Sequence, residues 1–278
     1  NLIDKLLPTS DLVPLIRRLF THGSGHTLWA ASALAADLDK QQTIALLIER
    51  LSSPHVSGCE NLVRLLASFA IPWNDGISDV VRVGLKGPAE SAVEVAKLAV
   101  SVAQSGQNDL LLLLEDALKY WAAHEEPYPE KGGAIPESPR AELIRARAKI
   151  SVPAYLELRA WLVDSRSDVR KASEESFLDW LRNGVGSRAQ FLHGISTGEL
   201  PPHLLGSALA QLSPLQSNEI SQLASLMESE DPGLRFNSMS LLHTDYLNAN
   251  QIRDRAHFMT QDQERQISER AYRILDTL

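Results

Sequence analysis

The sequence predicts an all-α protein built as a stack of helical hairpins. Leucine and alanine dominate a hydrophobic fraction of 44%, aromatic residues make up only 6%, and β-branched residues are few and scattered. Apolar side chains recur at helical spacing along most of the chain. Helix starts recur about every 31 to 33 residues, at Asp168, Pro201, Pro232 and Gln263. This interval is the length of two helices and two turns.

Before residue 125, turn and cap residues separate a series of helices. Thr9 and Ser10 are cap candidates for the first helix, which ends at the Gly-Ser-Gly turn at 23–25. Pro88 suits the first position of a later helix, whose small side chains follow one stripe through Ala103. The helices expected here run from 11 to that turn and over 27–37, 40–51, 58–71, 79–85, 88–103 and 109–121.

The helical pattern stops at 125–139, EEPYPEKGGAIPESP. Its prolines and its pair of glycines exclude regular structure. A loop of this length in a compact array is usually functional or a linker. We therefore divide the chain into an N-terminal helical-repeat half (1–124), an inserted Pro/Gly-rich loop (125–139) and a C-terminal repeat half (140–278), and expect one continuous stack.

Helical periodicity resumes after this loop. The clearest stripe lies in 164–181, where Val169, Phe177 and Trp180 share one face and charged residues occupy the other. Pro201 and other turn residues mark the boundaries of later helices. The helices expected here cover 141–150, 153–163, 168–182, 187–192, 201–212, 218–227, 232–242, 250–258 and 262–278.

Two of these helices resemble the first helix of HEAT repeats, in which an Asp, often Asp-Pro, precedes an aliphatic-Arg pair and a small residue. The matching segments are 168–172 (DVRKA) and 231–235 (DPGLR), although Asn237 replaces the small residue in the second. The resemblance implies a right-handed, armadillo-like α-solenoid of about 13–15 helices. It also implies a ladder of acidic and arginine side chains that pair between adjacent repeats. We assign this structural role to Asp168, Arg170, Asp231 and Arg235.

Motifs for catalysis or cofactor binding are absent from the sequence. No glycine motif that cradles a nucleotide phosphate occurs, and the eight histidines are scattered without an HExxH pair. Cys59 is the only cysteine, which excludes an intrachain disulfide and a multi-cysteine zinc site. We therefore expect a protein that is not an enzyme and has no cofactor and no metal site.

The longest apolar run, 110–114, is far shorter than the ~20 residues of a membrane span, and no signal peptide is visible. A single cysteine fits a reducing compartment. We expect a cytoplasmic protein that does not bind membranes. Because the chain starts in an apolar pattern and ends within an amphipathic helix, we also expect a segment of a longer polypeptide.

Candidate partner-binding residues come from the loop, the basic residues after it and one turn. Trp73 lies in a turn, and Trp is enriched at interface hot spots. Basic residues cluster after the loop, but acidic neighbours and a net charge of -8 disfavour nucleic acid as the partner. A protein partner is therefore expected. The candidate residues are Tyr128, Lys131, Ile135, Arg140, Arg145 and Trp73.

The function that these features favour is a non-catalytic scaffold that binds a protein partner through its concave face and the 125–139 loop. Two alternatives stay open. The GGAIPESPR segment is similar to parts of large bacterial helical-repeat proteins that accompany a nucleoside triphosphatase domain in defence systems, which implies a sensor segment of such an ATPase. HEAT-like solenoids also occur among DNA alkylation-repair glycosylases, which implies DNA binding.

Overall fold

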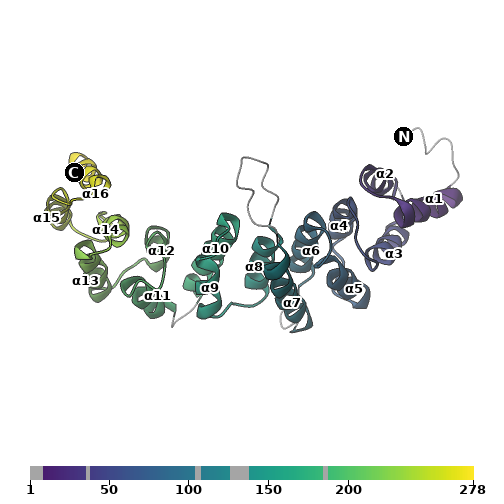
Figure 1. Ribbon diagram of the computed structural model, residues 1–278, viewed down its shortest axis with the longest axis horizontal. Helices are drawn as coiled ribbons and strands as arrows, with labels where there is room; N and C mark the ends of the chain where they lie inside the picture. The colour runs from purple at the N-terminus through teal and green to yellow at the C-terminus, as the bar shows by residue number, and fades with distance from the viewer. Residues whose placement is uncertain (1–8, 36–37, 104–107, 126–137, 184–186) are drawn as a thin grey trace. The chain divides into compact units, whose positions relative to one another are not determined.

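The computed structural model describes residues 9–35, 38–103, 108–125, 138–183 and 187–278. These residues form sixteen α-helices and two 3₁₀ turns and contain no strand (Figure 1). The predicted all-α class is confirmed, and the sixteen α-helices equal the number of helix ranges expected from periodicity and exceed by one the upper limit of 13–15 that the HEAT resemblance implies. The α-helices of the N-terminal part are α1 (Thr9–His22), α2 (His26–Ala35), α3 (Lys40–Leu51), α4 (Cys59–Ser68), α5 (Asp75–Gly84), α6 (Ala89–Val102), α7 (Asn108–His124) and α8 (Pro139–Ile150).

The remaining helices follow the same plan of short segments joined by tight turns. They are α9 (Tyr155–Leu162), α10 (Ser167–Asn183), α11 (Ser187–Ser196), α12 (Leu204–Leu212), α13 (Ser217–Ser225), η2 (Leu226–Glu228), α14 (Pro232–Ser238), η3 (Met239–Leu241), α15 (Ala249–Met259) and α16 (Arg265–Asp276). Side-chain caps set several starts. Asp39 accepts hydrogen bonds from two backbone N–H groups of α3, and Asn248 caps α15 by accepting one from the N–H of Gln251.

The chain divides into two compact units. Unit 1 comprises residues 1–153 and 165–172, and unit 2 comprises 154–164 and 173–278. Helix α8 packs against α6 and α7 and therefore belongs to unit 1. Helix α10 contributes its first residues to unit 1 and the rest to unit 2.

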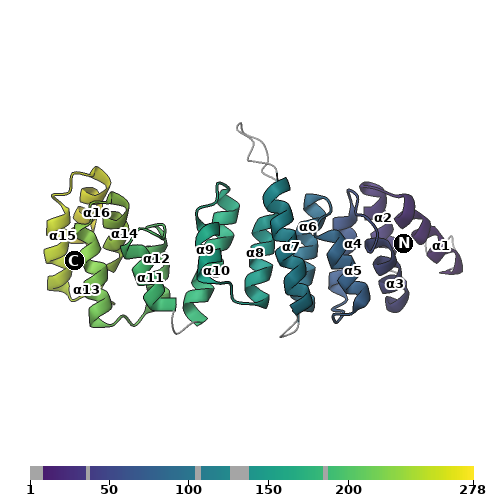
Figure 2. The ribbon, with the colours of Figure 1, turned by 60° about the horizontal axis from the view of Figure 1, so that its bottom comes forward.

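Within unit 1 each helix contacts its neighbour in the chain or the next helix but one. Helices α2, α4, α6 and α8 contact one another in succession, and so do α1, α3, α5 and α7 (Figure 2). Small buried residues on α6, including Ser91, Ala92 and Ala96, let its neighbours approach closely. The result is two rows of helices around one continuous apolar core.

Unit 2 shows the same contacts between alternate helices. Helix α11 contacts α13, α12 contacts α14, and α14 contacts α16. Its core is separate from that of unit 1 and includes Phe177 and Phe191, both fully buried. Among the described residues, every helix is too short or too polar to cross a bilayer.

Candidate functional site

Glu125 and Ser138 lie near the two ends of the predicted 125–139 loop, in the described part of the chain. The Glu125 carboxylate is buried and accepts a short hydrogen bond from the Ser138 hydroxyl, while Ser138 also accepts from the N–H of Ala141 at the start of α8. The loop residues Tyr128, Lys131 and Ile135 lie outside the described residues. The binding role proposed for them stays a prediction.

Two arginines complete a buried cluster around Glu125. Its Oε2 atom lies 3.5 Å from the guanidinium of Arg140 and 3.7 Å from that of Arg166. Arg166 in turn makes two hydrogen bonds to Asp168, at 2.8 and 3.1 Å. This cluster joins the end of α7, the start of α8 and the start of α10, so Arg140 stabilises unit 1 internally.

Arg145 and Trp73 also contact their own unit. Arg145 donates a hydrogen bond to Glu142 at 2.6 Å, one helical turn earlier. Trp73 is half-buried and packs against the core of unit 1. Neither side chain lines any of the three depressions described below.

The residues assigned to the ladder make different kinds of contact. Asp231 caps α14 by accepting from the N–H groups of Gly233 and Leu234. Arg170 donates to the carbonyl of Ser165 at 2.8 Å. Arg235 contacts a residue 27 positions later, which is about the length of one repeat. Its guanidinium donates two hydrogen bonds to Asp262, at 2.6 and 3.1 Å.

Ion pairs between successive hairpins do occur, and one of them includes Arg235, while the others join residues outside the four assigned to the ladder. Each joins two side chains 27 to 40 residues apart, and each lies within one unit. The pairs are Arg17–Glu49, Arg64–Glu94, Lys86–Asp116 and Arg147–Glu115 in unit 1, and Arg159–Glu199, Arg188–Glu219 and Arg235–Asp262 in unit 2. Most of these pairs join opposite charges 30 to 32 residues apart, a spacing that the sequence alone can suggest.

The partly buried pairs shift the pKa values of their carboxyl groups. Hydrogen bonds from Arg235 hold the pKa of Asp262 below its usual value. Burial alone would raise the pKa of Glu219, but hydrogen bonds from Arg188 lower it overall. Both carboxylates are therefore ionised at neutral pH and contribute to packing between hairpins.

The described residues contain no group of three or more His, Cys, Asp or Glu side chains that could hold a metal ion. Cys59 is buried, and burial raises the pKa of its thiol, so the thiolate nucleophile is disfavoured. His55 is also buried, between the Ser91 hydroxyl and the Leu51 carbonyl.

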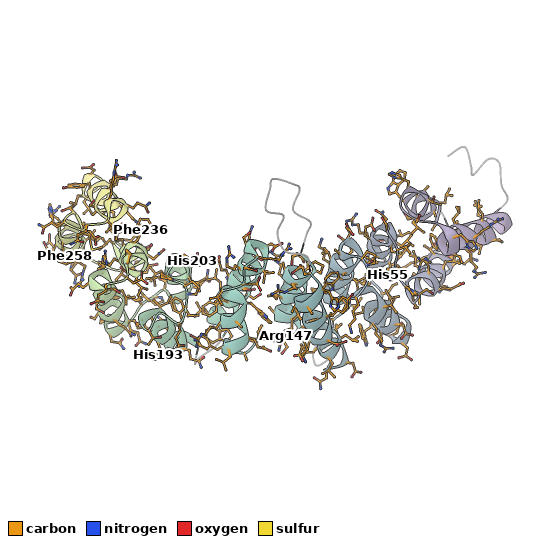
Figure 3. The ribbon with its side chains drawn as sticks, viewed as in Figure 1. His55, Arg147, His193, His203, Phe236 and Phe258 are labelled. Carbon is orange, nitrogen blue, oxygen red and sulfur yellow. The ribbon has the colours of Figure 1, made fainter. Side chains whose placement is uncertain are left out.

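Unit 2 carries a surface groove that sequence reasoning missed. Two depressions, of about 300 and 510 Å³, share the side chains of Met227, Glu228 and Phe258. Phe258 belongs to α15 and is 59% exposed (Figure 3). We call this the Phe258 groove. Its other lining residues are Arg235, Gln251, Asp254, Arg255, Gln261, Asp262 and Gln263.

Some charged side chains of the groove have an ion-pair partner among the described residues, and others do not. Asp262 is paired with Arg235, whereas Glu228 and Asp254 form no ion pair with any described residue. Both are exposed. Three glutamine amides add hydrogen-bond donors and acceptors, and Phe258 adds an apolar face. The groove therefore combines an aromatic surface with two carboxylates and one guanidinium, that of Arg255, which form no ion pair with any described residue.

Comparison with known proteins finds no matching family model, no similar curated protein and no similar solved structure.

Proposed function

We propose that this chain is a non-catalytic scaffold, a right-handed HEAT-like α-solenoid that binds a protein partner. The contacts between alternate helices and the ion pairs between successive hairpins support the repeat architecture. In such an array each hairpin is stabilised by its neighbours, and side chains on the surface stay available for recognition.

The Phe258 groove carries the binding part of this proposal. Exposed aromatic residues also occur elsewhere in the described residues, but Phe258, which is 59% exposed, lies beside two depressions, so its ring and the depressions together can receive side chains of a partner. Glu228 and Asp254 complement a positive charge, and the ring of Phe258 binds a cation or an apolar side chain. The favoured occupant is a linear protein segment with Lys or Arg next to an apolar residue.

Selection from a displayed peptide library tests this proposal. The chain is used as the target, and the affinities of enriched peptides are measured by titration calorimetry. We expect enrichment of basic residues beside apolar ones, and Phe258→Ala should weaken binding by about tenfold or more, as expected for loss of an aromatic anchor. Asp254→Asn should weaken it less and reduce its salt dependence.

Tyr272→Ala is the matched control, because Tyr272 is an aromatic residue of unit 2 that is 57% exposed and lies outside the groove. It should leave binding unchanged. If Tyr272→Ala and Phe258→Ala weaken binding equally, the groove is not the binding site.

We retain the 125–139 loop as a second contact with the partner. The buried Glu125 cluster supports this role because it ties down the residues on both sides of the loop. Deletion of Tyr128 to Ile135 should weaken binding of a full-length partner and leave binding of a groove peptide unchanged. Equal binding of the partner by the deleted and intact chains would exclude the loop.

DNA binding is the weaker alternative. In the basic cluster after the loop, Arg140, Arg145 and Arg166 lie in ion pairs with carboxylates of the same unit, which reduces the positive charge available to phosphates. We expect no DNA retention in a gel-shift experiment at low salt. Retention that weakens steeply with added salt would favour DNA as the partner.

A further inference from the structure

A third depression, of about 430 Å³, lies in unit 1 between α1, α3 and the turn after α3. We call it the Arg50 pocket. Its polar lining comes from Arg17, Thr21, Glu49, Arg50 and Ser53, and its apolar lining includes Val56. A volume of this size is in the range of small-molecule sites.

Arg50 is half-buried in this pocket and is held by backbone carbonyls alone. Its Nε donates to the carbonyl of Phe20 at 2.7 Å, and one terminal nitrogen donates to the carbonyl of Pro54 at 3.1 Å. Among the described residues no carboxylate forms an ion pair with it. A guanidinium has five N–H donors, so these two bonds leave donors and a full positive charge without a counter-ion.

A second guanidinium lies at the same pocket in a weak ion pair. Arg17 contacts Glu49 at 3.2 Å, and both side chains are more than half exposed. Exposed pairs of this kind contribute little free energy, so Arg17 can exchange Glu49 for another anion at low cost. The pocket thus holds two arginines against one carboxylate, with the hydroxyl-bearing residues Thr21 and Ser53 beside them.

We propose that the Arg50 pocket binds a phosphate monoester. Arg50 and Arg17 bind the phosphate oxygens, because the planar fork of a guanidinium matches two oxygens of a phosphate. Ser53 supplies a hydroxyl donor. Val56 and Pro54 contact the organic group of the ester, which makes an organic phosphate a better ligand than the free ion.

Titration with inorganic phosphate and with phenyl phosphate, followed by NMR of the backbone amides or by calorimetry, tests the site. We expect saturable binding with a dissociation constant on the order of 1 mM for inorganic phosphate and about tenfold tighter binding of phenyl phosphate. Arg17→Ala should weaken binding of both probes about fivefold. Glu49→Gln should tighten it about fivefold, because it removes a competing charge at close range.

The exposed pair Arg82–Asp79 provides matched controls in the same unit, because it has similar exposure and lies outside the pocket. Arg82→Ala and Asp79→Asn should leave both affinities unchanged. Arg50→Ala should abolish binding. Since that variant also loses two bonds to the backbone, the Arg17 and Glu49 variants decide the outcome if it does not fold.

The absence of saturable binding of either probe would overturn the proposal, and so would binding that Arg17→Ala and Glu49→Gln leave unchanged. Equal effects of the Asp79 and Glu49 variants would show a general charge effect and would also overturn it. A phosphotyrosine peptide separates two sources of the ester. Tighter binding of the peptide than of phenyl phosphate assigns the site to a phosphorylated protein, and equal binding assigns it to a small molecule.

Discussion

At the scale of single residues, Phe177 is central to the core of unit 2. Its side chain is fully buried, and its ring lies 5.2 Å from that of Trp180 and 5.9 Å from that of Phe191. Phe177→Ala should lower the free energy of unfolding by ~3 to 5 kcal/mol, because it leaves a cavity in close-packed surroundings. Chemical denaturation measures this change.

Phe258→Ala is the control for this substitution, because it removes the same atoms from an exposed position of the same unit. Its effect on the free energy of unfolding should stay within about 0.5 kcal/mol. Equal unfolding midpoints for Phe177→Ala and the parent chain would contradict the assignment of Phe177 to the core.

His55 should make stability depend on pH. Burial lowers the pKa of its imidazole below the ordinary 6.5, and the charge of Arg50 lowers it further, although the bond to the Leu51 carbonyl opposes this. The unfolded chain therefore binds the proton more readily than the folded chain. The contribution of neutral His55 to the free energy of unfolding is fully present above about pH 6.5. It is lost as the pH falls from there toward the pKa of His55 in the folded chain.

Chemical denaturation at a series of pH values checks this prediction. The free energy of unfolding of the parent chain should decrease as the pH falls below about 6.5. In His55→Gln, which does not titrate, the slope over this range should be smaller. An identical slope in both proteins would mean that His55 is not the group responsible.

At the scale of elements, the pair Arg235–Asp262 joins α14 to the turn before α16. Both side chains are mostly buried, and two hydrogen bonds connect them. A double-mutant cycle with Arg235→Met and Asp262→Asn should give a coupling energy of about 1 to 3 kcal/mol. The exposed pair Arg82–Asp79 should give about 0.5 kcal/mol or less. Equal coupling energies would show that the pair between hairpins has no special role.

The positions of several helices were predictable, whereas some of their ends were not. Helix α3 agrees with the expected range 40–51, because Asp39 is a clear cap. Helix α5 begins at Asp75 and not at 79, because the Asn74 side chain accepts from the N–H of Ile77. The pattern of apolar residues does not reveal such a cap. Helix α14 ends early in a 3₁₀ turn, η3, where local packing decides the geometry.

At the scale of the whole molecule, the two units have separate cores. A core substitution should therefore destabilise mainly its own unit, as in arrays whose stability is a sum of local contributions. Leu66→Ala in unit 1 should accelerate amide hydrogen exchange in α4 and the helices that contact it. Leu209→Ala should do so in unit 2. Exchange that accelerates equally in both units after either substitution would show a single cooperative domain.

The sequence by itself determined the all-α class and the approximate helix ranges, because helical periodicity, caps and proline positions act over a few residues. Tertiary structure decided which charges meet, because a side chain's partner about 30 residues away depends on how hairpins stack. Arg235 thus paired with Asp262, 27 residues away. The Phe258 groove and the Arg50 pocket are likewise lined by residues of separate helices, so no local sequence pattern predicts them.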